Sequence, residues 1–196
     1  WISYSPAATE FDLGLAKKEL NRVTARDSAT LRSTELTLGA ATIQIALENR
    51  KVVQTFAWGS APRPRALADD YEVKGDSLAI DTPAEILKEL RAFRGAWVGF
   101  RPDSAQGERD WLAGDSITAF FVSRAVAGSA PRAALQQLEA RRQAKSFYRL
   151  AGSGDGATKP SISYARADKI VLTMQGGDSL KVQRVEMSGN VDGVQL

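Results

Sequence analysis

The residues of this chain that could carry chemistry are carboxylates, hydroxyls and basic side chains, because the sequence contains neither histidine nor cysteine. Without histidine, the commonest general base and the commonest transition-metal ligand are missing, which excludes Ser-His-Asp catalysis and most zinc sites. Without cysteine, thiolate catalysis, disulfides and cysteine-ligated zinc are excluded as well. We therefore expect no catalytic residues, no metal and no cofactor, and we predict that the chain is not an enzyme.

The remaining polar motifs give weak signals. The acidic residues between Asp103 and Asp115 lack the spacing of a calcium loop, and no Lys-Ser/Thr follows the glycine-rich run at 152–156, as a phosphate-binding loop would require. The basic cluster at 141–145 could meet lipid phosphates, although a solvated sheet edge explains it more simply. The net charge of +3 is spread along the chain and does not indicate a nucleic-acid partner. A glycan hydrolase using two carboxylates is the one enzyme class left open.

Three aspartates, Asp76, Asp115 and Asp168, occupy equivalent positions just before apolar segments. Catalytic carboxylates are rarely placed once per repeat. The recurrence therefore indicates a structural role at the start of a strand, such as an Asx-type turn.

These aspartates belong to an internal repeat, in which an alternating apolar segment is followed at a fixed distance by Ala-x-x-x-Ala. Two looser copies start at Ile117 and Ile170 and lead to Ala140 and Met187. In the three clearest copies the first apolar residue precedes the first alanine by 14 residues, and these pairs are Phe11 and Ala25, Ile43 and Ala57, and Leu78 and Ala92.

The first half of each copy alternates with a period of two, which predicts strands. The second halves at 84–91 and 133–142 are rich in helix-forming residues. The equivalent segment 179–187 alternates, however, and follows a Gly-Gly-Asp hairpin signal. Because copies of a repeat share one conformation, we expect strands there too, with a helical turn possible at the start of 133–142. If 84–94 and 133–147 were helices, the chain would instead be a helical-repeat binding protein.

We therefore predict an all-β chain of about five β-hairpins and roughly ten strands, forming a single domain over residues 1–196 that could be excised from a longer protein. Hairpin turns are expected at 16–18 and 49–50. Turn-rich linkers are expected at 60–65, 101–107 and 151–156.

The recurrent Gly-Asp-Ser-(Leu/Ile) or Ala-Asp-Lys-Ile motif resembles the OstA-like family of LptA-type periplasmic lipopolysaccharide transport proteins. The resemblance is carried by Gly75 to Ala96, by Ala167 to Gly193 and by the stretch from Asp110 to Ile117. It implies a twisted, open β-jellyroll with an apolar interior that holds lipid acyl chains. It also implies edge-strand pairing with other jellyroll modules, head-to-tail self-association included. A periplasmic location is implied for a mature or trimmed chain, since no signal peptide precedes Trp1. The segments 126–131 and 152–160 depart from the compact repeat.

The function that follows is binding the acyl chains of lipopolysaccharide, or of a similar glycolipid, and passing them along a periplasmic bridge toward the outer membrane. The alternative is a structural β-repeat scaffold with a sealed core and no ligand. The residues predicted to line the interior are the alternating apolar ones, namely Phe11, Leu13, Val23, Ile43, Ile45, Leu78, Ile80, Leu90, Ile117, Leu138, Ile170, Leu172, Val185 and Met187.

Overall fold

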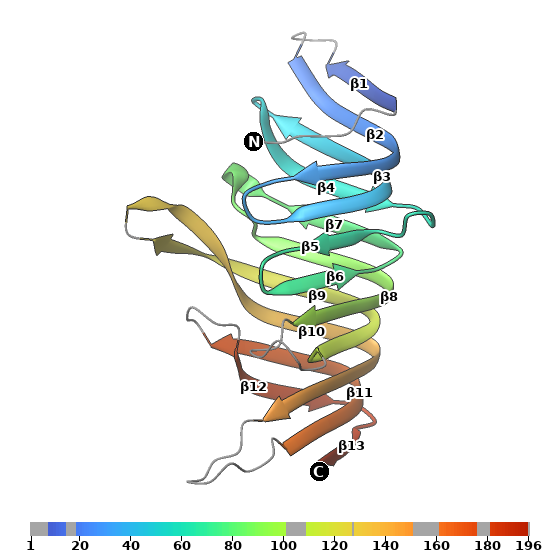
Figure 1. Ribbon diagram of the computed structural model, residues 1–196, viewed down its shortest axis with the longest axis vertical. Helices are drawn as coiled ribbons and strands as arrows, with labels where there is room; N and C mark the ends of the chain where they lie inside the picture. Colours follow the sequence, from blue (N-terminus) through green and yellow to red (C-terminus); the bar gives the residue numbers. More distant parts are fainter. Residues whose placement is uncertain are drawn as a thin grey trace.

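The computed structural model describes residues 8–14, 19–100, 109–126, 128–150, 161–175 and 181–195. These residues form thirteen strands and one short 3₁₀ helix (Figure 1), and no α-helix occurs among them. The strands are β1 (Ala8–Gly14), β2 (Glu19–Arg32), β3 (Thr37–Glu48), β4 (Lys51–Trp58), β5 (Arg65–Leu67), β6 (Tyr71–Lys74), β7 (Ser77–Asp81), β8 (Glu89–Phe100), β9 (Trp111–Val126), β10 (Ser129–Leu150), β11 (Ser161–Gln175), β12 (Lys181–Ser188) and β13 (Asp192–Gln195), and the 3₁₀ helix is η1 (Pro83–Glu85).

The predicted all-β class is confirmed, and so is the strand interpretation of 133–142, while for 84–91 it holds at 89–91 alone. Residues 84–91 contain the end of η1 and the start of β8, while 133–142 lie inside β10 without an initial helical turn. The expected number of about ten strands is too low, because strands also form in the parts taken as polar links. The turn at Asn49 and Arg50 is confirmed, and both residues have positive φ, as a two-residue hairpin turn requires. The turn predicted at 16–18 and the linkers at 101–107 and 151–156 lie outside the described residues.

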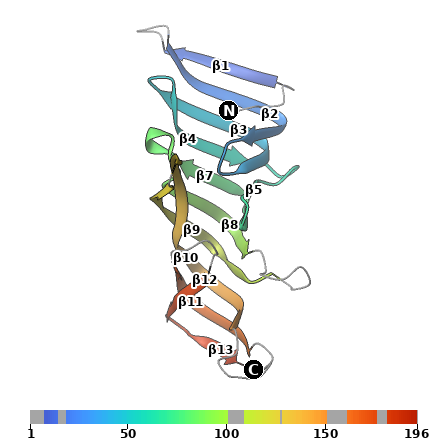
Figure 2. The ribbon, with the colours of Figure 1, turned by 60° about the vertical axis from the view of Figure 1, so that its left-hand side comes forward.

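The strands form one antiparallel sheet whose order largely follows the sequence. The main path runs β1-β2-β3-β4-β7-β8-β9-β10-β11-β12, while β5 bridges β3 and β6, β6 pairs with β8, and β13 pairs with β11. Figures 1 and 2 show a long, twisted stack with β1 at one end and β12 and β13 at the other. No helix in the described part of the chain has the length and apolar character needed to cross a bilayer.

The long strands bend at the Ala-x-x-x-Ala segments, which we call the corners. At the corners of β2, β8 and β10 the bent strand carries one more residue than its partner. Such a bulge bends a strand and increases its twist. Two successive residues of positive φ lie in each of four corners, and these pairs are Asp27 and Ser28, Arg94 and Gly95, Arg142 and Gln143, and Gly189 and Asn190.

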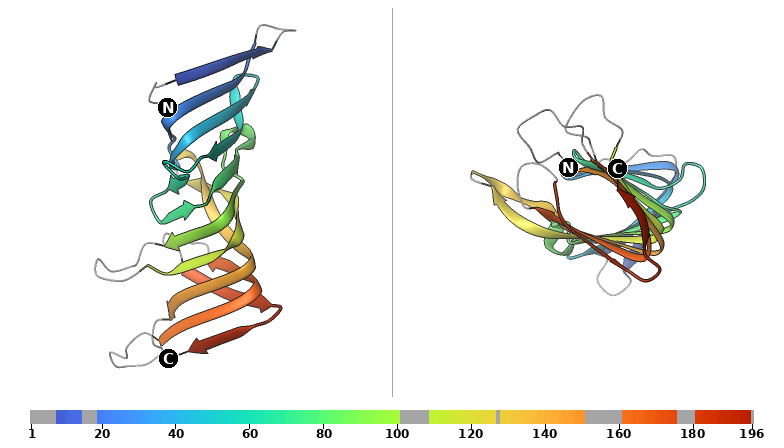
Figure 3. Two further views of the ribbon diagram at one scale, coloured as in Figure 1. Left: turned by 90° about the vertical axis from the view of Figure 1, so that its right-hand side faces the viewer. Right: turned by 90° about the horizontal axis from the view of Figure 1, so that it is seen from below.

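The corners divide the sheet into two walls that enclose one interior, as the end-on view of Figure 3 shows. The first wall contains residues 20–26, 42–58, 77–93, 116–126, 128–141, 169–175 and 181–188, and the second contains 29–40, 65–74, 96–100, 111–114, 144–150, 161–167 and 192–195. The corner alanines are buried, for example Ala92, Ala96, Ala140 and Ala144. Small side chains are needed there because the two walls meet at the corner.

The repeated aspartates stabilise these corners. The backbone N–H of Asp76 donates to the carbonyl oxygens of Phe93 (2.9 Å) and Arg94 (3.2 Å), and that of Asp168 donates to Gly189 O (2.8 Å). The Asp168 carboxylate also accepts a hydrogen bond from the Asn190 side chain at 3.0 Å. In place of the predicted Asx-type turn, the three carboxylates contact neighbouring segments of the chain, since those of Asp76 and Asp115 pair with Arg63 and Arg142.

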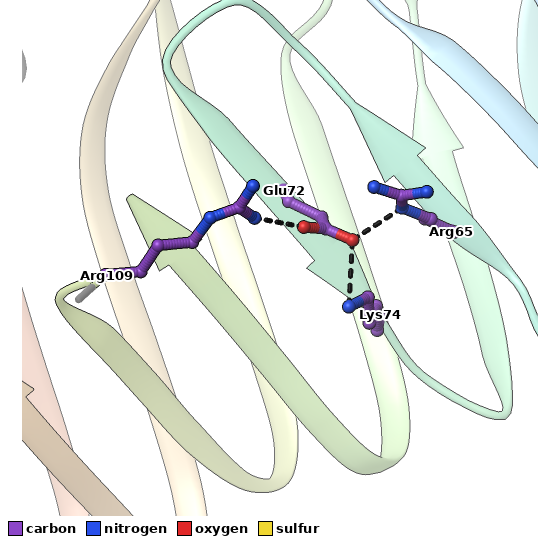
Figure 4. Close-up of polar contacts among 4 residues, drawn as sticks. All are labelled: Arg65, Glu72, Lys74 and Arg109. Carbon is purple, nitrogen blue, oxygen red and sulfur yellow. Dashed lines mark hydrogen bonds and ion pairs between the residues drawn. The ribbon is translucent and has the colours of Figure 1, made fainter. Parts of the chain in front are cut away.

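The outer face of the second wall holds a buried carboxylate, Glu72 on β6, surrounded by three cations (Figure 4). Its Oε1 lies 2.5 Å from Arg65 Nε and 2.8 Å from Lys74 Nζ, and its Oε2 pairs with Arg109. Burial by itself would raise the pKa of Glu72. Hydrogen bonds from Lys74, Arg65 and Arg109 outweigh burial and lower this pKa below its ordinary value. The cluster joins β5 and β6 to Arg109, which lies two residues before β9.

We predict that Glu72→Gln lowers the free energy of unfolding by about 1–2 kcal/mol at pH 7, because three cations lose their shared anion. Since the folded pKa lies below the unfolded value of 4.5, the stabilisation is complete above that value and is lost as the pH falls through the folded pKa. Urea unfolding at pH 7 and at about pH 3 should therefore show that the difference in free energy of unfolding between the parent chain and Glu72→Gln is smaller at the acidic pH. Glu186→Gln is the control, because Glu186 pairs with Arg184 on an exposed surface. A Glu72→Gln effect no larger than this control would contradict the prediction.

Candidate functional site

The interior face of the first wall is built from two cross-strand rows of apolar residues. A row here means residues paired directly across successive strands. The first inner row is Ala25, Ile43, Ala57, Leu78, Ala92, Ile117, Ala140, Ile170 and Met187. The second inner row is Phe11, Val23, Ile45, Thr55, Ile80, Leu90, Ala119, Leu138, Leu172 and Val185.

The first inner row explains the 14-residue step of the repeat. Ile43 pairs with Ala57 and Leu78 pairs with Ala92. In these two copies the apolar residue and the alanine 14 residues later are therefore direct partners across one hairpin. In the first copy the register differs by two residues, because Phe11 pairs with Val23. From Ala25 to Ile170, large and small side chains alternate along the row, which lets neighbours interdigitate without voids.

Thirteen of the fourteen predicted lining residues belong to these two rows, and Leu13 pairs with Leu20 further toward the β1–β2 turn. The ten of them from Val23 to Leu172 have buried side chains in the hydrophobic core. Val185 and Met187, on β12, are half-buried and pack against that core. For Phe11 and Leu13 the structure describes the strand register alone.

The sequence analysis missed the opposite side of the interior. The second wall contributes a third inner row, made of Leu31, Leu38, Ala66, Val73, Val98, Leu112, Ser146 and Ala165. The available signal was alternation just outside the repeat units, as in Leu36-x-Leu38-x-Ala40 and Ala96-x-Val98-x-Phe100. We had assigned these stretches to links between hairpins.

The inner rows contain no charged residue, and Thr55 and Ser146 are their polar members. Among the described residues, no three Asp or Glu side chains come close enough together to hold a metal ion. An extended apolar surface of this kind can bury hydrocarbon, and it offers no group for acid–base chemistry.

The side of the interior opposite the corners, which we call the open side, is bridged at two places. The Tyr71 ring lies 5.9 Å from that of Phe121 across the two walls, and Glu35 Oε1 accepts a hydrogen bond from the Ala133 N–H at 3.0 Å. Burial raises the pKa of the Tyr71 phenol, and the Glu35 and Asp70 carboxylates raise it further, so the phenol stays neutral at physiological pH.

A pocket of about 190 Å³ opens between the walls on this side. Its apolar lining includes Leu31 and Leu36 from the second wall and Ile80 and Leu87 from the first. Ile80 is a member of the second inner row, so the pocket connects solvent with the interior. Its volume lies below the roughly 300–1,000 Å³ of a site that encloses a drug-sized ligand.

Comparison with known proteins identifies the fold. The crystal structure of LptH, the LptA homologous periplasmic component of the conserved lipopolysaccharide transport device from Pseudomonas aeruginosa, matches 83% of this chain and 92% of its own with a TM-score of 0.50. This chain has an LptA-type fold. The sequence identity is 13%, so the LptA-type likeness predicted from the motifs is confirmed at the level of the β-jellyroll fold. No family model and no curated protein matches the sequence.

The alternation within the first inner row of this LptA-type jellyroll can be tested by exchanging two cross-strand neighbours, Ala92 and Ile117. Ala92→Ile should lower the free energy of unfolding by about 1–3 kcal/mol, because the larger side chain overpacks the core. Ile117→Ala should lower it by about 2–5 kcal/mol, because it leaves a cavity. The double variant restores the total side-chain volume. Its loss in free energy of unfolding should therefore be smaller than the sum of the two single-variant losses by at least about 1 kcal/mol. Urea unfolding measures all three variants, and strict additivity would show that the two side chains do not share one space.

Proposed function

We propose that this chain binds the acyl chains of lipopolysaccharide, or of a similar glycolipid, in its jellyroll interior and passes them along a periplasmic bridge toward the outer membrane. The observation that carries the proposal is the continuity of the two inner rows, which give almost every strand an apolar contribution to one interior. LptH is a periplasmic component of a lipopolysaccharide transport device, and the likeness to it supports the same function and a periplasmic location. The role is transport, without catalysis.

The energetics of such binding need no charged group. Each buried methylene contributes about 0.8 kcal/mol, so a few methylenes outweigh an exposed ion pair worth about 0–1 kcal/mol. A smooth apolar lining also suits a carrier, because its cargo must leave again. We therefore propose the fourteen predicted lining residues, together with the third inner row, as the acyl-chain contacts.

A second function, a structural scaffold with a sealed core, is favoured by one observation. Leu78, Ile117 and Leu138 are each at most 1% exposed, so their side chains already fill the space between the walls. Under the transport proposal the walls must separate on the open side to admit lipid. The two functions therefore differ in whether lipid reaches the inner rows.

The discriminating experiment places a photo-crosslinking amino acid at Ile80, beside the pocket between the walls, and separately at Leu138, deeper in the second inner row. In cells that make lipopolysaccharide, we expect lipid adducts at both positions. The readout is a lipopolysaccharide-reactive band of raised mass on a denaturing gel.

The matched controls are Ala79 and Phe56, which are direct cross-strand neighbours on the outer face of the first wall. Ala79 is buried by neighbouring side chains and Phe56 is exposed, so together they control for depth and for accessibility. No adduct is expected at either position. Adducts at none of the four positions, in a folded protein, would favour the sealed scaffold.

The ends of the sheet support the proposed pairing with other jellyroll modules. In the described residues β1 pairs with β2 alone, and β12 and β13 each pair with β11 alone. Val191 and Val194 next to this edge are each 56% exposed. Unpaired edges add strands from other chains readily. We therefore propose edge-to-edge contacts with further modules, including head-to-tail association of this chain.

We predict that Val194→Lys weakens self-association at least tenfold, because it removes an exposed apolar side chain from the edge strand and puts a charge in its place. Sedimentation velocity over a concentration series measures the effect. Gln195→Lys is the control, since it adds the same charge at the next residue of β13 without removing an apolar side chain. Equal association of both variants and the parent chain would exclude this edge as the contact.

A further inference from the structure

A long groove lies on the outer face of the sheet, away from the interior proposed to carry lipid. It measures about 810 Å³ and follows the corners of three successive repeat copies. Its lining combines aromatic, hydroxyl, cationic and carboxylate side chains. The proposed lipid transport gives this groove no task, so it calls for a separate explanation.

The groove is hollow because two small side chains stand between larger ones along one outer row. Ser77, Phe93, Ser116, Arg141 and Lys169 are direct cross-strand neighbours. The two serines are short and form the floor between taller neighbours. Phe93 is 39% exposed and presents part of its ring to the groove.

Two exposed arginines line the groove at successive corners. Arg94 and Arg142 have φ of 59° and 57°. Other residue types, such as Ser28 and Gln143, also adopt positive φ at corners, so the bend leaves the choice of side chain open. At these two corners the chain places guanidinium groups on the outer face, where they can meet an anion.

The charges around the groove are only partly neutralised. Arg142 Nη1 lies 3.3 Å from Asp115 Oδ2 in a largely exposed pair, and Lys169 and Arg141 share the Glu139 carboxylate. The Arg94 guanidinium has no ion-pair partner among the residues that the structure describes. An anionic group can therefore bind to Arg94 and Arg142 without breaking a buried salt bridge.

The mixed lining favours a sugar over a nucleic acid. Asp115 and Asp168 also line the groove, and their carboxylates accept hydrogen bonds from sugar hydroxyls but repel a phosphodiester chain. The ring of Phe93 offers an apolar face for a pyranose, and Ser77 and Ser116 add hydroxyls. We propose that this outer corner groove binds an anionic carbohydrate, with its phosphate or carboxylate on Arg94 and Arg142 and a sugar ring against Phe93.

The test is an NMR titration of the ¹⁵N-labelled chain with three sugars, namely trigalacturonic acid, glucose 6-phosphate and neutral maltotriose. We expect shifts confined to the groove and at least tenfold tighter binding of an anionic sugar than of maltotriose. Preference for the phosphate or for the carboxylate compound identifies the source of the anion. The interaction should weaken as ionic strength rises, because the charges are exposed.

The variants use the backbone conformation of the corner. Arg94→Asn with Arg142→Asn removes both guanidiniums while keeping residues that tolerate positive φ, and should weaken anionic-sugar binding at least tenfold. Arg50→Asn is the matched control, because Arg50 is an exposed arginine with φ 65° in the β3–β4 turn, outside the groove. The proposal is overturned if none of the sugars binds, if maltotriose binds as tightly, if the double variant binds like the control, or if a thymidine hexanucleotide binds more tightly than every sugar.

Discussion

The bend at each corner is the constraint on which the rest of this structure depends. Every long strand must bend on the same side of the interior. A slip of one residue in the strand pairing would exchange the inner and outer faces of that strand beyond the corner. The bend requires two residues of positive φ, which costs roughly 1–2 kcal/mol for each residue other than glycine. Backbone hydrogen bonds from Asp76 and Asp168 and the burial of the flanking alanines offset this cost. The Ala-x-x-x-Ala motif is thus the chemical signature of a corner.

The corner also separates the tasks of the two faces. Inside, it requires small residues and fixes the register of the inner rows, so Leu78, Ile117 and Ile170 lie along one line. Outside, the two left-handed residues point away from the core, and their identity is less restricted. The corners accordingly carry Asp-Ser, Arg-Gly, Arg-Gln and Gly-Asn. One repeated backbone device can therefore support a uniform apolar interior together with locally different exterior chemistry.

The same geometry explains which features could be predicted from the sequence. The hairpin register was readable because Ile43 and Ala57, like Leu78 and Ala92, are direct partners within one wall. Residues 133–142 could be assigned to a strand against their helix propensity, since tertiary packing buries Leu138 and Ala140 on one face with a period of two.

On the strands that enter a repeat copy, the second wall could not be read in this way, because there the corner breaks the period of two. A strand entering a repeat copy crosses the corner in three residues, as from Gly114 to Ile117, whereas the strand leaving it uses four, as from Ala92 to Ala96. On the entering strand, this step of three residues changes the inward-facing side chains from even-numbered to odd-numbered residues. Leu112 and Ile117 therefore share the interior although simple alternation assigns them to opposite faces.

A carrier built on this plan is stiff on one side and weakly closed on the other. Along the corners, the long strands β2, β3, β8, β9, β10 and β11 run continuously from one wall to the other and are hydrogen-bonded to their neighbours. On the open side, the described contacts between the walls include the Tyr71–Phe121 ring pair and the hydrogen bond to Glu35. These are worth about 0.5–1.5 kcal/mol each. Burying four methylenes, at about 0.8 kcal/mol each, exceeds their sum. Separating the walls also removes packing contacts from buried residues such as Leu78, Ile117 and Leu138, so under the proposed function the acyl chains must replace that buried apolar area as well.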